Sequence, residues 1–263
     1  MMLVASWAVT FSQGHLSENL RLDKSGLSKA QPTELLTAGV NSYFSPDLTV
    51  GLGLARAWVS ENASGEPTEV GISLSESSLD SLPSVETDYV FELPKERGKN
   101  FYTFVMLNWN PHGHDPIQIY GLPHFDVHFY IVPNEMRMAI GPDDMKQFAN
   151  APATKYVPEK YILVPGGVMA MGAHWADVTS PEFNGSKFTK TFLWGSYDGN
   201  FIFWEPMITR EYLLSHPDEN ITLKQPSAYQ RDGYYPTRYR VSYSPSEKSY
   251  TIAITDLEFH KGE

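Results

Sequence analysis

The sequence predicts an all-β protein, built as a single β-barrel or jelly-roll-like domain with a few short peripheral helices. Segments of five to nine residues rich in Val, Ile, Phe, Tyr, Trp and Thr recur along the chain, separated by clusters of Gly, Pro, Asn and Asp. Aromatic residues make up 13% of the 263 residues and charged residues 19%, which is a globular composition. Without an internal repeat or a composition break, we expect one domain over residues 1–263, with a core at 40–215 and a C-terminal hairpin at 236–258.

Three β-hairpins can be read directly from the sequence. Each consists of two β-rich segments around a loop of turn-forming residues, and Asp198-Gly199 is the strongest of these turn signals. The paired segments are residues 54–60 with 68–75, 188–195 with 200–206, and 237–243 with 249–255.

Helical signals are few and short, and the first residues of the chain favour a strand. Pro142 and Pro206 suit the first turn of a helix. Residues 1–11, "MMLVASWAVTF", lack a basic segment and are shorter than a usual signal peptide, so we expect a first strand, with a truncated export signal as the alternative. The three expected helices lie at residues 75–82, 142–150 and 205–216.

The composition excludes several classes of function. Acidic residues outnumber basic ones 31 to 20, and no Lys/Arg run is present, so nucleic acid is not an expected partner. No apolar stretch approaches the roughly 18 residues of a membrane-spanning helix, so no membrane span is expected. Because the chain has no cysteine, it has no disulfide or thiolate nucleophile, and His, Asp and Glu are its remaining strong metal ligands.

Histidines are concentrated in one part of the chain. Five of the eight lie between residues 112 and 174. Alternate residues of an extended strand share a face. In "PHFDVHFY" we therefore expect the apolar residues to pack into the core and the polar residues to face solvent or line a cavity. The polar set is His124, Asp126, His128 and Tyr130.

The rise per residue of a strand limits how these histidines can share one metal ion. At about 3.3 Å per residue, His124 and His128 would lie roughly 13 Å apart. Either a bulge or strong twist brings the two histidines together, or only two neighbouring residues of this face bind the ion. Asp126 is then either a ligand itself or the acceptor that orients an imidazole. His174 follows a glycine-rich segment and is a third candidate ligand. Two histidines with one carboxylate suit an open iron site, and histidines with a water molecule suit zinc.

Two further candidates lie outside this strand. Glu205 continues a face that we expect to contain Phe201 and Phe203, and is either a buried functional carboxylate or the point where the strand emerges into solvent. His114 lies in a Pro/Gly loop that could cover a site. We therefore assign candidate roles as follows: metal ligands His124, His128 and His174; acid/base residues Asp126 and Glu205; further contributors His114, Asp126 and Tyr130.

Four segments together resemble an uncharacterised bacterial β-domain family, classed as a domain of unknown function. They are "LNWNPHGHDP", "YGLPHFDVHFY", "MGAHWADVTSPEFNG" and "FLWGSYDGNFIFWEPMIT", and the likeness covers roughly residues 50–212. The resemblance implies a single mostly-β domain, self-association and frequent export to an extracytoplasmic location, without a known reaction. The positions that match the family motifs are His114, His124, Asp126, His128, His174 and Glu205.

The sequence leaves more than one functional hypothesis. The first is a β-barrel protein with one divalent zinc or iron ion, held by the three candidate histidines, that activates water or dioxygen on a small organic substrate. The second is a non-catalytic ligand-binding protein. The third is a self-assembling extracytoplasmic or stress protein, a homo-oligomer whose His/Asp cluster satisfies buried polar groups. A strand with surface or hydrogen-bonded histidines is the simplest reading.

Overall fold

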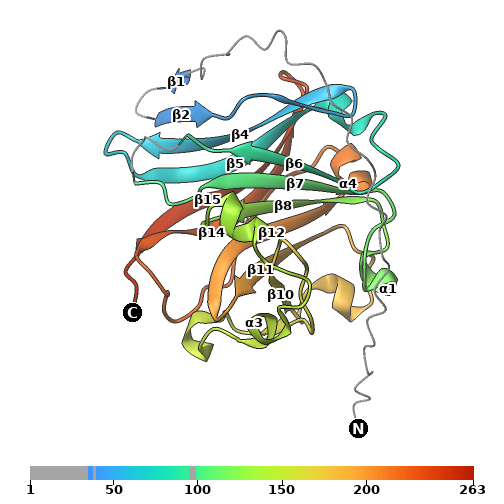
Figure 1. The fold of residues 1–263 in the computed structure, drawn as a ribbon. Coiled ribbons are helices and arrows are strands. Elements are labelled where there is room, and N and C mark those ends of the chain that lie inside the picture. Colours follow the sequence, from blue (N-terminus) through green and yellow to red (C-terminus); the bar gives the residue numbers. More distant parts are fainter. Residues whose placement is uncertain (1–34, 38–39, 95–98) are drawn as a thin grey trace. The chain divides into compact units, whose positions relative to one another are not determined.

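The computed structural model describes residues 35–37, 40–94 and 99–263, which belong to one compact unit of two antiparallel β-sheets (Figure 1). The expected all-β class is confirmed, but the sheets are not closed into a barrel. The strand expected at residues 1–11 lies outside the described residues, so a single domain over the entire chain stays a prediction. None of the described helices is long and apolar enough to cross a membrane.

The first sheet, sheet A, includes the C-terminal hairpin. Its order is β1-β2-β4-β5-β15-β14-β13, with β3 also paired to β4. Because β15 pairs with β5 over seven register positions, the hairpin is part of the main sheet. The strands are β1 Leu35–Thr37, β2 Val40–Phe44, β3 Leu48–Val50, β4 Gly53–Asn62, β5 Pro67–Ser75, β13 Asp218–Thr222, β14 Gly233–Ser244 and β15 Ser249–His260.

The second sheet, sheet B, contains every strand that bears a candidate site residue. Its order is β6-β7-β8-β12-β11-β10-β9, so β8 lies between β7 and β12 near the middle. The strands are β6 Thr87–Glu92, β7 Phe104–Asn110, β8 His124–Tyr130, β9 Tyr161–Leu163, β10 Ala173–Asp177, β11 Lys190–Tyr197 and β12 Asn200–Thr209.

All three hairpins expected from the sequence are present, as β4/β5, β11/β12 and β14/β15. In the β11/β12 turn, Asp198 and Gly199 both have positive φ, 46° and 77°. Positive φ at both central residues is the geometry of the type I′ turn, whose twist matches that of the flanking strands.

The helices are all short, as expected, and two begin later than the prolines predict. Pro142 precedes the helix that begins at Met145, where Asp144 is the N-cap residue. Pro206 does not begin a helix, because it lies inside β12 opposite Phe192. The helix begins at Arg210, where the Thr209 side chain accepts a hydrogen bond from the Tyr212 backbone N–H and caps it. The helical segments are η1 Glu76–Leu79, α1 Ile117–Tyr120, α2 Asn134–Met138, α3 Met145–Ala149, η2 Thr154–Tyr156, η3 Pro181–Asn184 and α4 Arg210–Leu214.

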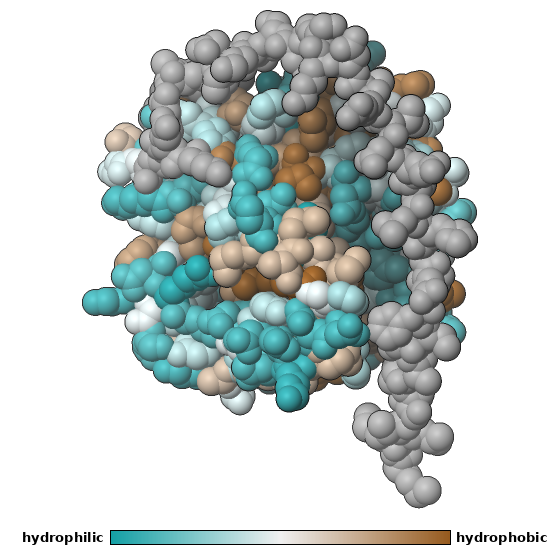
Figure 2. Space-filling model, in the orientation of Figure 1, coloured by the Kyte–Doolittle hydropathy of each residue, from teal (hydrophilic) through white to brown (hydrophobic). Residues whose placement is uncertain are grey.

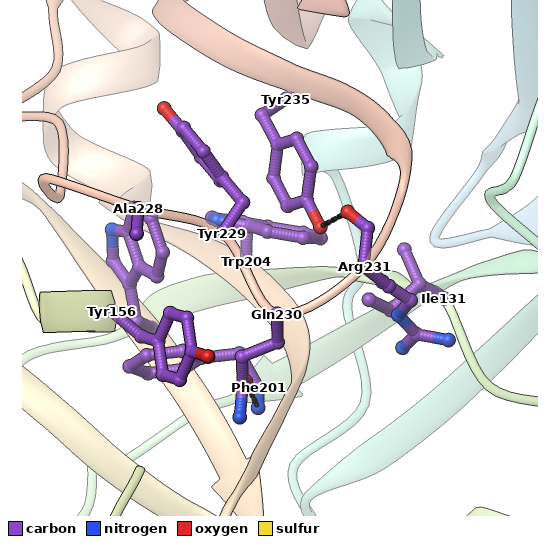
Figure 3. A pocket seen from close by; sticks show the side chains of 10 residues that line it. Ile131, Tyr156, Phe201, Trp204, Ala228, Tyr229, Gln230, Arg231 and Tyr235 are labelled. Atoms are coloured by element: carbon purple, nitrogen blue, oxygen red, sulfur yellow. Dashed lines mark hydrogen bonds between the residues drawn. The ribbon is translucent and has the colours of Figure 1, made fainter. Parts of the chain in front are cut away.

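The main core lies between the two sheets. Sheet A contributes buried aliphatic residues such as Ile72 and Ile252, and sheet B contributes aromatic residues such as Phe129 and Trp204. At one end of this core, a cavity of about 10 Å³ is lined by aromatic side chains, and the Tyr235 hydroxyl there donates to the Arg231 carbonyl (Figure 3). Such a volume holds one water molecule at most, so this cavity is a packing feature and not a ligand site.

The other face of sheet B is covered by loops and short helices. Two smaller apolar clusters lie on it: Phe104, Tyr130 and Phe203 pack with residues of the segment 132–148, and Met207 packs with Tyr120 and Phe188. In Figure 2, apolar residues form a band across the middle of the visible face between hydrophilic regions. Side chains on this outer face of sheet B are therefore shielded from solvent.

Gly195 is required for packing on this outer face. A Cβ atom at Gly195 would lie 2.0 Å from the ring of Phe203, which is fully buried. We predict that Gly195→Ala lowers the free energy of unfolding by about 1–3 kcal/mol, because the ring has to shift within a packed layer. Urea unfolding measures this, with Gly141→Ala as the control, since a Cβ there would make an ordinary 3.6 Å contact with Asp144. Equal losses in both variants would contradict the prediction.

Candidate metal centre

Strand β8 separates its apolar and polar residues onto two faces. Phe125, Val127 and Phe129 pack in the core between the sheets. The polar set expected from alternation lies on the outer face, where His124 and His128 are 0% exposed. This face is therefore an interior layer beneath the covering segments, and the reading of surface histidines does not hold for these two residues.

The first group of candidate ligands is formed by His114, His124 and Asp126, each of which offers an atom within 4.8 Å of the others. The distance from His124 Nε2 to Asp126 Oδ1 is 3.1 Å, and that from His114 Nε2 to Asp126 Oδ2 is 3.4 Å. Asn110 donates from Nδ2 to Asp126 Oδ2 at 2.8 Å. The carboxylate is thus held by an amide on the neighbouring strand, with an imidazole facing each of its oxygens.

The other ring nitrogen of each histidine in this group is fixed by the backbone. His124 Nδ1 lies 2.6 Å from the Leu122 carbonyl oxygen, and His114 Nδ1 lies 2.8 Å from the Asp115 carbonyl oxygen. A carbonyl only accepts, so each Nδ1 carries the proton, and Nε2 presents either a lone pair or a second proton to Asp126. An imidazole held in this way is typical of histidines that bind a metal through Nε2.

The second group of candidate ligands is formed by His128, His174 and Glu205. The distance from His128 Nε2 to Glu205 Oε1 is 3.4 Å, and that from His174 Nε2 to Glu205 Oε2 is 3.3 Å. Within the described ranges, both ring nitrogens of His128 and the Oε2 atom of Glu205 are buried without a hydrogen-bond partner. His124 Nε2 and Asp126 Oδ1 of the first group are buried without a partner in the same way. Such unpaired polar atoms are costly to bury, so a bound ion would stabilise both groups.

A β-bulge in β12 sets the direction of Glu205. The β11/β12 register shifts between Gly195 and Ser196, and the residue between Phe201 and Phe203 has no partner of its own. Phe201 therefore packs in the core while Phe203 lies on the outer face. The expected common face of Glu205 and both phenylalanines is wrong in this respect, because the alternation that we assumed is interrupted.

Strand pairing brings the second group together from three strands. On β12, Trp204 pairs with Phe129 and Met207 with Asp126, which places Glu205 beside His128. His174 enters from β10, where it pairs with Gly195. The ring of Phe203 lies 5.0 Å from that of His128 and 5.4 Å from that of His174, measured between centroids. The Phe203 ring therefore packs against both histidines of the second group.

The structure divides the three expected histidine ligands between two groups. His124 belongs to the first group, whereas His128 and His174 belong to the second, so they do not form the single set that the sequence suggested. Tyr130 stacks on His128 with ring centroids 5.8 Å apart, and its hydroxyl has no partner among the described residues. His112 is exposed and belongs to neither group.

Asn110 is a site residue that the sequence analysis missed. It follows Asn108 at the spacing of one strand face, and both alternate with the core residues Leu107 and Trp109. Two asparagines on the outward face of a buried strand would have been a usable signal. Asn108 itself donates to Asp88 on β6, so the polar face continues across three strands.

The two groups carry charge differently. Burial opposes protonation of His114, but the Asp126 carboxylate, which faces its Nε2 atom at 3.4 Å, outweighs burial and raises the pKa of His114 to about 9. Burial raises the pKa of Asp126, but the His124 and His114 imidazoles outweigh it and hold this pKa well below its usual range. Burial lowers the pKa of His128 and outweighs the charge of Glu205. A proton on His114 therefore balances the first carboxylate, while His128 remains neutral.

The contact distances favour a shared ion over direct hydrogen bonds. Charge-assisted N–H···O bonds are usually about 2.7–2.9 Å long. Two ligands bound to one tetrahedral zinc ion at about 2.0–2.1 Å lie about 3.4 Å from each other. The four imidazole–carboxylate distances are 3.1, 3.4, 3.4 and 3.3 Å. The residues therefore fit a metal ion by donor type, by burial and by spacing.

The first group makes a testable pH prediction for the metal-free protein. His114 should titrate with a pKa of about 9, and Asp126→Asn should lower this pKa, because burial is then opposed only by the Asp115 carbonyl and the more distant Glu205. NMR titration of the histidine ring signals measures both values. Since the folded-state pKa is raised, the contact stabilises the fold fully below about pH 6.5 and loses this effect as the pH rises through about 9. A His114 pKa near the usual histidine value of about 6.5 in the unsubstituted protein would contradict the prediction that Asp126 raises it.

Comparison with known proteins gives a partial match to a family without a described activity. A family model described as "TTHB210-like: Hypothetical protein TTHB210" matches residues 62–109, from the end of β4 to β7. This segment stops before His112 and contains none of the six candidate ligands, so it does not test the motifs of the resemblance. No curated protein and no solved structure matches the chain significantly. The similarity agrees with an uncharacterised family and assigns no function. The function is therefore inferred from the geometry of the site.

Proposed function

We propose that this chain is a metal-binding protein that holds two divalent ions on the outer face of sheet B. One ion is bound by His114, His124 and Asp126. The other is bound by His128, His174 and Glu205. The observation that carries the proposal is that each of four imidazole Nε2 atoms lies 3.1–3.4 Å from one of two buried carboxylates.

The donor set favours zinc or iron. Each group offers two imidazole nitrogens and one carboxylate, and the chain has no cysteine. Two histidines with one carboxylate, and an open position, occur in zinc hydrolases and in non-haem iron oxygenases. Calcium and magnesium prefer oxygen ligands and match these groups poorly.

The first group is the better candidate for chemistry because it is the more accessible. The His114 side chain is 38% exposed, whereas His174 is 16% exposed and His128 is fully buried. A metal bound there would activate water or dioxygen toward a small organic substrate, since three protein ligands leave a coordination position free. Asp126 and Glu205 then act as ligands, and neither is available as a free acid or base.

The second group favours a structural role for its ion. Its ligands come from β8, β10 and β12, and an ion there would connect three strands while compensating the buried Glu205 carboxylate. This observation also keeps a non-catalytic protein as the second candidate function. Self-association and an extracytoplasmic location rest on the family resemblance alone and stay predictions.

Metal stoichiometry tests the proposal. Protein purified without a histidine tag and loaded with zinc should bind two equivalents after gel filtration, as measured by elemental analysis. His114→Ala and His174→Ala should each lose about one equivalent, because each removes one of only three protein ligands.

His112→Ala is the matched control, because His112 is exposed and belongs to neither group. It should retain both equivalents. The proposal is wrong if the unsubstituted protein holds no stoichiometric metal, or if the three alanine variants lose metal equally.

A further inference from the structure

A second site-like feature lies apart from the candidate metal ligands. A cleft of about 310 Å³ opens between β9 and β11 of sheet B and β13 and β14 of sheet A, beside η3. None of the six candidate metal ligands lines it. Its volume is at the lower end of the range for small-molecule sites, so it suits a ligand of modest size.

The lining of this cleft is rich in hydroxyl groups. Hydroxyls both donate and accept hydrogen bonds, which suits a ligand that carries several hydroxyls of its own. The aromatic rings of Tyr161, Phe192 and Tyr239 add apolar wall. The hydroxyl-bearing residues that line the cleft are Tyr161, Thr179, Ser180, Thr189, Thr191, Thr222 and Tyr239.

The lysines around the cleft are all neutralised by acids. Lys190 pairs with Glu219 at 3.1 Å, Lys224 pairs with Asp177 at 2.6 Å, and Lys187 pairs with a glutamate of α4. A phosphate or carboxylate ligand would have to compete with these acids for the ammonium groups. The charge balance therefore favours a neutral ligand.

Two buried polar groups in the wall are available to such a ligand. Tyr239 is 4% exposed, and its hydroxyl makes no hydrogen bond within the part of the chain that the structure describes. Glu182 is 8% exposed, and burial raises the pKa of its carboxyl group. The Tyr120 hydroxyl lies 3.5 Å from Glu182 Oε1. The Thr191 side chain and the backbone N–H of Glu182 also hydrogen bond this carboxylate. Its two oxygens offer about four lone-pair sites, so acceptor capacity is left for ligand hydroxyls.

We propose that this cleft binds a small, neutral, polyhydroxylated ligand of the size of a mono- or disaccharide. Ligand hydroxyls donate hydrogen bonds to Glu182 and accept one from Tyr239. The apolar face of the sugar ring packs against the aromatic side chains of the cleft. Binding does not depend on the metal. The cleft is nevertheless close to the first ligand group, because the ring centroid of Tyr120 lies 5.8 Å from that of His114.

Ligand-observed NMR and calorimetry on the full chain test this inference. The probes are glucose, galactose, maltose, cellobiose and inositol, with glucosamine and glucose 6-phosphate as charged analogues. We expect at least one neutral probe to bind, with unchanged affinity after EDTA treatment. Tyr239→Phe should weaken binding about two- to tenfold, since it removes the hydroxyl donor. Glu182→Gln should weaken binding about tenfold or more, since it replaces one acceptor oxygen with an amide donor and removes the charge at nearly the same side-chain volume.

Tyr197→Phe is the matched control, because Tyr197 bonds Asp144 and does not line the cleft. It should bind the neutral probe as the unsubstituted protein does. Thermal melting of each variant shows that the fold is retained. The inference is overturned if no neutral probe binds, if only the charged analogues bind, or if Tyr239→Phe and Glu182→Gln bind as well as the control. None of these outcomes affects the metal stoichiometry, so failure here is distinct from failure of the proposed function.

Discussion

The pleat of β8 is the constraint on which the rest of the site depends. Because successive side chains point to opposite faces, the strand that fills the core with Phe125, Val127 and Phe129 must place His124, Asp126 and His128 on its other face. That face is covered by apolar segments, so a carboxylate and two imidazoles are buried together. Burial of this kind is costly unless each charge is compensated.

The two groups compensate their charge in different ways. In the first group, a proton on His114 can balance Asp126, and the backbone carbonyls fix the remaining ring nitrogens. In the second group, His128 stays neutral and has no hydrogen-bond partner within residues 40–94 and 99–263. A metal ion would replace a proton at the first group and would bind buried atoms that have no hydrogen-bond partner at the second. The second ion should therefore contribute more to stability and the first more to reactivity.

Local sequence patterns predicted the strands and the faces of this protein well. Alternation in β8 and the three hairpins required only short-range rules, and both are present. The grouping of the ligands could not be predicted in the same way, because it depends on cross-strand register. The bulge in β12 directs Glu205, and the pairing of β10 with β11 delivers His174 to it. The 13 Å separation expected within a regular strand agrees with His124 and His128 lying in different groups. Whether the sheets close is also a long-range property, which explains why the sequence left a barrel and a jelly-roll-like domain as alternatives.

X-ray absorption at the zinc edge tests the central claim most directly, because it reports the ligands of the bound ions. For zinc-loaded protein, we expect a nitrogen and oxygen shell at about 2.0–2.1 Å, with outer-shell scattering from about two imidazoles per ion and no sulfur. His128→Ala should lower the imidazole contribution of the zinc that remains bound, or remove one zinc altogether. A shell of oxygen atoms without imidazole scattering would contradict the account, because the ions would then be bound elsewhere on this acidic chain.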